Sequence, residues 1–316
     1  MAHAFVFPGQ GSQAVGMGHP LAGAFDCARA VFEEVDEALG QKLSHLMWDG
    51  PIEDLTLTEN AQPAIMASSL AVVRVLKEQF GIDVSGAAFV AGHSLGEYSA
   101  LAAAGSLSIA DAAKLLKLRG QAMQKAVPVG EGAMAALIGA DMNTAEDAAK
   151  AGAQHGVCQV ANDNAPGQIV ISGSTAGVDA AIAKAQELGV KRAMTLPVSA
   201  PFHCTLMQPA ADAMADALAN ATFSAPCVPV VVNVRAAAES DPEVLRKLLV
   251  EQVTGRVRWR ESVQWMAGEG NVDTFVELGG KVLTGMLRRS APDAKGVSLI
   301  TPEDLEAFAA SHKGEF

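Results

Sequence analysis

The sequence predicts an α/β fold in which a small βαββαβ unit is inserted into a larger domain. Three observations predict it. Short apolar runs that suit buried strands alternate with longer helical patterns along the chain. The first two of these runs each end in a glycine-rich loop. Residues 132–195 show a separate succession of short strand and helix patterns. We therefore divide the chain into a large domain, 1–127 with 197–316, and a small domain, 128–196.

The large domain has strand patterns that are short and apolar and helical patterns that follow them. The expected strands are Ala4–Phe7, Ala87–Ala91, Val228–Val232 and Thr274–Glu277. The expected helices include Leu21–Leu39, Glu97–Ala104, 108–126 and Lys281–Arg289. Ser108, with Asp111 three residues later, is typical of a helix N-cap.

The small domain contains four strand patterns and two helical ones. In chain order they are the strand Gly132–Gly139, the helix Thr144–Gln154, the strands Val157–Ala161 and Gln168–Ser172, the helix Thr175–Leu188 and the strand Val190–Leu196. A turn at 162–167 is expected between the two middle strands. The order βαββαβ is the split pattern of ferredoxin-like units.

Composition excludes several classes of protein. Half of the 316 residues are apolar, which provides for a sizeable core, and the net charge is −12. That charge argues against nucleic-acid binding, and an acidic protein partner would need a local basic patch. The first residues do not resemble a signal peptide, and no apolar run reaches the roughly 20 residues of a membrane helix. Four cysteines without a CxxC pair suggest neither disulfides nor a metal site. We expect a cytoplasmic, monomeric protein that stands alone.

A serine nucleophile is predicted at Ser94. Gly92-His93-Ser94-Leu95-Gly96 matches GxSxG and lies between a predicted strand and a helix of small residues. On such a sharp turn, the two glycines let strand and helix pass closely and push the hydroxyl outwards. The alternative is an ordinary glycine turn in a chain with 30 glycines.

The catalytic base is expected at His203. It lies in a proline-rich loop directly after a predicted strand, Pro197–Cys204. A neutral imidazole there could take the serine proton and return it to a leaving thiol. Of the other six histidines, His93 adjoins the serine and should point elsewhere, and the rest are expected at the surface. No clear acid of a triad precedes His203, so a backbone carbonyl could orient the ring instead.

Backbone N–H groups should stabilise the oxyanion. One is that of Leu95, the residue after the nucleophile. The second is expected from Gln10 in the loop Gly9-Gln10-Gly11. This loop also fits GxGxxG/A, the dinucleotide fingerprint, but no strand ending in an acid follows about 20 residues on.

Arg119 interrupts the buried stripe of a helix. Ala112, Leu115, Leu116 and Met123 share its face. Arg119 could snorkel at the edge of the stripe, or it could hold a free carboxylate in two parallel hydrogen bonds. With a serine and a histidine nearby, the second possibility suits an acyl group with a distal carboxylate, such as malonyl.

These residues resemble the acyltransferase family of fatty acid and polyketide synthesis, which includes bacterial malonyl-CoA:acyl carrier protein transacylases. The matching segments span nearly the whole chain in the family's order. They are Phe-Val-Phe-Pro-Gly-Gln-Gly-Ser-Gln (5–13), Asn-Ala-Gln-Pro-Ala (60–64), Gly-His-Ser-Leu-Gly-Glu (92–97), Arg119, Leu-Pro-Val-Ser-Ala-Pro-Phe-His (196–203), Leu-Val-Glu-Gln-Val-Thr (249–254), Val-Arg-Trp (257–259) and Glu-Leu-Gly-Gly-Lys-Val-Leu-Thr-Gly (277–285).

The resemblance implies a hydrolase-like domain with a mostly parallel sheet that carries the ferredoxin-like insert. It implies malonyl transfer from malonyl-CoA to holo-acyl carrier protein through a malonyl-serine, without metal or bound cofactor. Its roles would fall on Ser94 and His203 for catalysis, Gln10 and Leu95 for the oxyanion, Arg119 for the malonyl carboxylate, Gln252 for orienting His203, and Gln62 and Asn162 for lining the cleft.

The residue before the catalytic histidine bears on acyl choice in this family. Phenylalanine there accompanies malonyl and serine accompanies methylmalonyl, so Phe202 favours malonyl. Phe202 differs from the small residue that stand-alone bacterial members often carry. Two other functions stay open: a serine thioesterase or hydrolase of related fold, and a non-catalytic module that binds carrier protein. Carrier protein is usually acidic, and its docking candidates are Lys114, Lys117, Lys191, Arg192, Lys281, Arg288 and Arg289.

Overall fold

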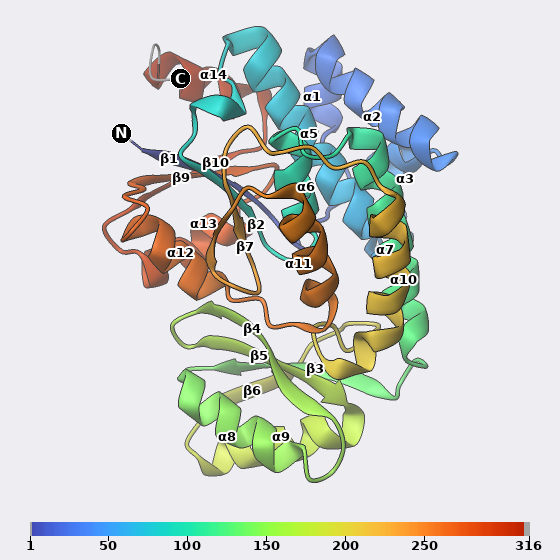
Figure 1. The fold of residues 1–316 in the computed structure, drawn as a ribbon, viewed down its shortest axis with the longest axis vertical. Helices are drawn as coiled ribbons and strands as arrows, with labels where there is room; N and C mark the ends of the chain where they lie inside the picture. Colours follow the sequence, from blue (N-terminus) through green and yellow to red (C-terminus); the bar gives the residue numbers. More distant parts are fainter. Residues whose placement is uncertain (1, 313–316) are drawn as a thin grey trace.

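A computed structural model describes residues 2–312 and shows an α/β fold with two separate sheets (Figure 1). The larger sheet has the strand order β10-β9-β1-β2-β7-β8. Its strands are β1 (His3–Phe7), β2 (Phe89–Gly92), β7 (Val230–Val232), β8 (Ala237–Glu239), β9 (Thr274–Leu278) and β10 (Lys295–Leu299). All neighbours pair in parallel except β7 and β8. The predicted α/β fold with a mostly parallel sheet is confirmed.

Both faces of the larger sheet are buried along its central strands, as their continuous apolar sequences require. Along β1, Phe5 and Phe7 pack into one core, while Ala4 and Val6 pack into the core on the other face. The helices around the larger sheet are α1 (His19–Ala24), α2 (Asp26–Leu39), α3 (Leu43–Asp49), α4 (Ile52–Thr56), α5 (Thr58–Phe80), α6 (Gly96–Ala103), α7 (Ile109–Ala126), α10 (Gln208–Asn220), α11 (Pro242–Thr254), α12 (Trp259–Ala267), α13 (Val282–Ser290) and α14 (Pro302–Ser311).

The second sheet is antiparallel and has a core of its own. It has the order β4-β5-β3-β6, with α8 and α9 packed on one face (Figure 1). Its elements are β3 (Gly132–Ile138), α8 (Met142–Gly152), β4 (Cys158–Ala165), β5 (Gln168–Ser174), α9 (Thr175–Glu187) and β6 (Arg192–Thr195). The chain order βαββαβ is the one that the sequence predicts, and this strand order is that of a ferredoxin-like unit.

The turn expected at 162–167 is wrong. Strand β4 runs on to Ala165, so the connection is only Pro166-Gly167. Two register shifts, one before Asn162 and one before Ala165, keep this polar stretch in the strand. Asn162 therefore projects from a strand and not from a loop.

The single helix expected over Leu21–Leu39 is also wrong. Phe25 has extended backbone angles and separates α1 from α2. Its ring packs edge-on against that of Phe80, at 6.3 Å between centroids. A tertiary contact that the local pattern cannot reveal thus interrupts the helix. The Ser108 cap of α7 is confirmed, since its hydroxyl accepts the Asp111 N–H.

Two of the histidines expected at the surface are buried. His3 lies on β1 and His312 follows α14, and their rings meet edge-on at 5.3 Å between centroids. Within residues 2–312, no helix is both long and apolar enough to cross a membrane.

Candidate active site

Ser94 lies on the sharp turn between β2 and α6. Its φ is 54°, a left-handed conformation that a residue with a side chain seldom adopts. The flanking glycines make the turn possible. A Cβ on Gly92 would lie 1.9 Å from the carbonyl carbon of Gly96, and one on Gly96 would lie 2.3 Å from the carbonyl oxygen of Phe7. The close passage of strand and helix therefore requires glycine at both positions.

Asn233 holds this turn from the neighbouring strand. It directly follows β7 and is fully buried. Its side-chain oxygen accepts the Ser94 N–H at 2.8 Å, and its amide donates to the Gly92 carbonyl at 2.7 Å. Its own N–H donates to Glu97 at 2.8 Å. Two hydrogen bonds from Asn233 thus hold the strained turn of the serine, and the third anchors Asn233 itself to Glu97.

We expect Asn233→Ala to weaken both the fold and the reactivity of Ser94. The change leaves buried backbone groups unpaired, which typically costs about 1–3 kcal/mol each. Urea unfolding should show lower stability, and Ser94 acylation should slow by about tenfold or more because the turn relaxes. Asn233→Asp, which retains the acceptor for Ser94, should fall between wild type and alanine. Wild-type acylation in Asn233→Ala would contradict this role.

His203 meets Ser94 from the loop between β6 and α10. Its Nε2 lies 2.7 Å from Ser94 Oγ, and its Nδ1 lies 2.9 Å from the backbone oxygen of Gln252 on α11. Donation from Nδ1 to that carbonyl leaves Nε2 free to accept the serine proton. His203 also has a positive φ, 58°. Burial, and then the nearby Arg119 guanidinium, lower the pKa of His203 to about 3, so the ring is neutral at ordinary pH.

Arg119 is buried, with 1% of its surface exposed, and so does not snorkel. It extends from α7 to the serine: its Nη2 donates to Ser94 Oγ at 3.2 Å and to the Gln252 side-chain oxygen at 2.9 Å. Its Nη1 donates to the side chain of Gln62 on α5 at 2.9 Å. Among the residues described, no carboxylate pairs with it directly, and its Nε has no hydrogen-bond partner. A buried guanidinium that has no carboxylate partner of its own is suited to bind an incoming anion.

These groups open onto one cavity of about 410 Å³. Eight of the nine predicted site residues line it: Gln10, Gln62, Ser94, Leu95, Arg119, Asn162, Phe202 and His203. The ninth, Gln252, accepts a hydrogen bond from Arg119 and donates one from its side-chain amide to the Ser94 carbonyl at 3.0 Å. Within residues 2–312, the N–H groups of Gln10 and Leu95 donate no hydrogen bond, so both are available to an oxyanion.

The chain is similar to known proteins over almost its whole length. Residues 4–296 match the family model of the acyl transferase domain. A malonyl CoA-acyl carrier protein transacylase of Bacillus subtilis (strain 168) is 45% identical over 314 residues, which is 99% of this chain and 98% of that protein. The chain belongs to the acyl transferase family.

Solved structures of this family superpose over nearly the whole chain. An acyl-carrier-protein-S-malonyltransferase from Bartonella henselae has a TM-score of 0.96 and 55% identity, covering 98% of this chain and 99% of that one. A malonyl-transacylase in complex with a type II PKS acyl-carrier protein has a TM-score of 0.94 and 40% identity, covering 98% and 100%.

Some residues of this acyl transferase site escape sequence reasoning. Asn233 follows a three-residue strand, and no motif marks it. The His93 ring lies edge-on to that of Trp259, with 5.8 Å between centroids, and its Nε2 meets the side-chain oxygen of Asn164 at 2.8 Å; the ring also lines the same cavity as Ser94. His93 and Glu97 both lie in the Gly-His-Ser-Leu-Gly-Glu segment, and their place beside Ser94 is the sequence signal that could have identified them. Burial raises the pKa of Glu97 to about 7.

The basic residues considered for docking an acidic partner differ in availability. Lys117 is engaged, because its Nζ lies 3.0 Å from a carboxylate oxygen of Glu59 and bonds Gln41 and Asn60 as well. The exposed candidates are Lys114, Lys191, Arg192, Lys281, Arg288 and Arg289.

Proposed function

We propose that this acyl transferase moves a malonyl group from malonyl-CoA to the pantetheine thiol of holo-acyl carrier protein. One observation carries the proposal. Ser94 Oγ lies within hydrogen-bond distance of both a neutral imidazole, His203, and a buried guanidinium, Arg119. A nucleophile, a base and a carboxylate-binding group thus meet at one atom. The relatives named above as malonyl transferases support the same substrate.

The first half-reaction loads the serine. His203 Nε2 takes the proton of Ser94 as Oγ attacks the thioester carbonyl of malonyl-CoA. The carbonyl oxygen becomes an oxyanion and accepts the N–H groups of Gln10 and Leu95. The carbon–sulfur bond then breaks, and His203 returns the proton to the CoA sulfur. The malonyl group remains on Ser94 as an ester.

The second half-reaction repeats these steps with another thiol. His203 takes the proton of the pantetheine thiol, the sulfur attacks the ester, and Ser94 leaves with its proton restored. The carrier protein departs with the malonyl thioester. CoA must leave before the carrier arm enters, which makes the kinetics ping-pong. No step requires a metal or a bound cofactor, because the thioester already activates the acyl group.

The orientation of His203 does not require a carboxylate. The Gln252 carbonyl accepts the Nδ1–H and fixes the tautomer that attack requires. The same residue uses its side chain to hold Arg119 and the Ser94 carbonyl. Gln252 therefore fixes the positions of His203, Arg119 and Ser94 relative to one another.

Arg119 would bind the distal carboxylate of malonyl. The incoming carboxylate replaces the contact of Nη2 with Ser94 Oγ and reaches the unpaired Nε. Gln62 accepts a hydrogen bond from Nη1, and Asn162 lines the same cavity. Phe202, 8% exposed at the cavity wall, would crowd a 2-methyl branch, a discrimination worth about 1–3 kcal/mol.

The neutral state of His203 predicts the pH dependence of acylation. Because the folded-state pKa is about 3, well below the ordinary 6.5, the rate of Ser94 acylation should not fall as pH drops from 8 through 6.5. The contribution of His203 to stability should behave differently: the unfolded chain binds a proton below pH 6.5 that the folded chain excludes, so this contribution to the free energy of unfolding decreases there. Glu97 acts in the opposite direction between about pH 7 and pH 4.5, because burial raises its folded-state pKa and the folded chain binds the proton first.

Rapid-quench acylation by malonyl-CoA across pH 5–9 checks this. Glu97, with its pKa near 7, could add a step of its own, and Glu97→Gln isolates it. A fall centred near pH 6.5 that persists in Glu97→Gln would show that His203 titrates normally.

The test of the proposed function is intact mass after brief exposure to malonyl-CoA, beside acetyl-CoA. We expect a malonyl adduct that disappears when holo-acyl carrier protein is added and reappears on the carrier. Free malonate without transfer would instead support a hydrolase. The proposed setting is fatty acid synthesis in the cytoplasm, by a monomer. A polyketide pathway is the second candidate, since one similar structure contains a type II PKS carrier protein.

A further inference from the structure

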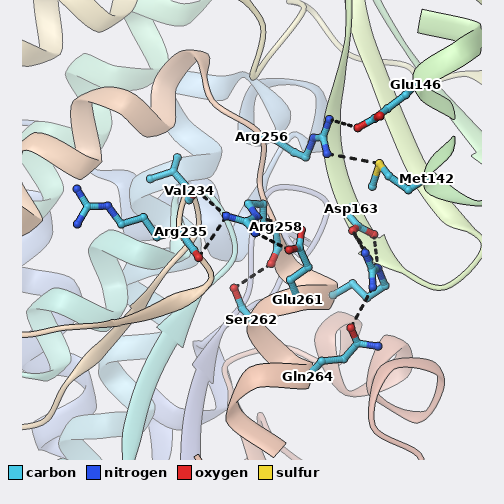
Figure 2. Close-up of polar contacts among 11 residues, drawn as sticks. Met142, Glu146, Asp163, Val234, Arg235, Arg256, Arg258, Glu261, Ser262 and Gln264 are labelled. Carbon is cyan, nitrogen blue, oxygen red and sulfur yellow. Dashed lines mark hydrogen bonds and ion pairs between the residues drawn. The ribbon is translucent and has the colours of Figure 1, made fainter. Parts of the chain in front are cut away.

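Arg256, Arg258 and Arg260 occupy alternate positions in the sequence after α11, and each meets a carboxylate. Figure 2 labels Arg256 and Arg258 with their partners, and Asp163. Arg258 pairs locally with Glu261, its Nε 3.0 Å from Oε1. The other two reach the antiparallel sheet and its helices. Arg256 Nη2 lies 3.0 Å from Oε1 of Glu146 on α8, and Arg260 meets Asp163 on β4.

The Arg260–Asp163 pair differs from the others in geometry and burial. Arg260 Nε lies 2.9 Å from both carboxylate oxygens of Asp163, and Nη2 lies 2.7 Å from Oδ2. The Asp163 side chain is 1% exposed, against 38% for Glu146. A buried carboxylate is costly without its cation, so this contact holds β4 firmly. Arg260 Nη1 also donates to Gln264 at 3.0 Å, which anchors the arginine on its own helix.

Backbone hydrogen bonds join the same two segments. The Asp163 N–H donates to the Val257 carbonyl at 2.9 Å, and the Val257 N–H donates to the Ala161 carbonyl at 2.8 Å. Asn162 and Val257 form a parallel bridge. The segment that follows α11 thus extends the edge of the antiparallel sheet at β4.

The residues on either side of Asp163 belong to the acyl-transfer cavity. Asn162 lines it, and Asn164 contacts the ring of His93, the residue before the nucleophile. Asp163 does not line this cavity; together with Arg260 it lines a different one, so its side chain lies outside the acyl-transfer cavity. The arginine segment begins four residues after Gln252, which holds His203 and Arg119. One stretch of chain therefore links both walls of the cavity.

We infer that the Arg260–Asp163 ion pair is a positioning device for acyl transfer. It sets where Asn162 and the Asn164–His93 pair lie relative to Ser94, and thereby how well the cavity holds its thioester substrate. Neither residue touches the reacting atoms. This inference rests on the proposed function.

Steady-state kinetics with malonyl-CoA test it. Arg260→Gln should raise KM by about tenfold and change kcat less than about twofold, because the cavity wall shifts while Ser94, His203 and Arg119 stay in place. Asp163→Asn should do the same, and the double variant should be no worse than either single one. Arg260→Lys should recover most of the affinity. The matched control is Glu146→Gln, which breaks the Arg256 pair between the same regions and should leave KM unchanged.

A second measurement does not depend on any acyl substrate. The imidazole ¹⁵N–¹H signals of His93 report its tautomer, and donation from Nε2 to Asn164 should be lost or exchange-broadened in Arg260→Gln but retained in Glu146→Gln. If the wild type is not acylated by malonyl-CoA, the proposed function fails, while the His93 signal still tests the positioning. A lower melting temperature in Arg260→Gln with unchanged KM and an unchanged His93 signal would overturn the inference.

Discussion

Ser94→Ala is expected to abolish the malonyl adduct and to lower transfer to carrier protein by a factor of about 10⁴ or more, the usual consequence of removing a nucleophile that acts with its base. Ser94 Oγ lies within hydrogen-bond distance of both His203 and Arg119. Without it, the cavity retains its oxyanion donors and can still bind substrate, but no ester can form.

Intact mass after exposure to malonyl-CoA measures this change directly. Ser99→Ala is a matched control, since Ser99 is also buried on α6 and its hydroxyl has no hydrogen-bond partner among the described residues. It should acylate like the wild type. An adduct that survives in Ser94→Ala would place the nucleophile elsewhere and refute the proposed mechanism.

Arg119→Ala is expected to change substrate preference as well as rate. Removing one partner of a buried charge contact costs about 2–5 kcal/mol, so kcat/KM for malonyl-CoA should fall by roughly 10²–10³. Acetyl-CoA has no distal carboxylate, and its slow acylation should change much less. Arg119→Lys should recover only part of the loss, because an ammonium cannot reproduce a two-pronged contact.

Parallel acylation rates with the two thioesters measure the preference. Arg74→Ala serves as a control, because Arg74 lies on α5 and pairs with Glu78 at the surface. If the acylation rates with malonyl-CoA and acetyl-CoA fall equally in Arg119→Ala, the guanidinium supports the reactivity of the serine and does not bind the distal carboxylate.

The fold could be predicted from the sequence wherever local patterns decide it. The apolar strands β1 and β2 and the βαββαβ order are examples. The misses arise from tertiary contacts. Phe25 breaks a helix to meet Phe80, and β4 continues through polar residues because the Val257 segment pairs with it. The sequence pattern does not predict strands β8 and β10, because β8 has only three residues and β10 is half-exposed.

The site could be predicted because its residues stand in short, distinctive segments. Ser94 has its glycines, His203 its proline-rich loop and Arg119 its apolar helix face. Asn233 and Asp163 have no such setting. Their importance comes from which strand lies beside which, and that follows from topology and not from spacing along the chain.

Ser94 and His203 share a left-handed backbone without being glycine. Each such residue costs about 1–3 kcal/mol that the surrounding structure must offset. At these two positions, a backbone conformation that made the fold more stable would therefore be expected to slow acyl transfer. Gains in heat tolerance should be sought in residues far from this pair, where a substitution does not relax the geometry that keeps the hydroxyl and the imidazole facing each other.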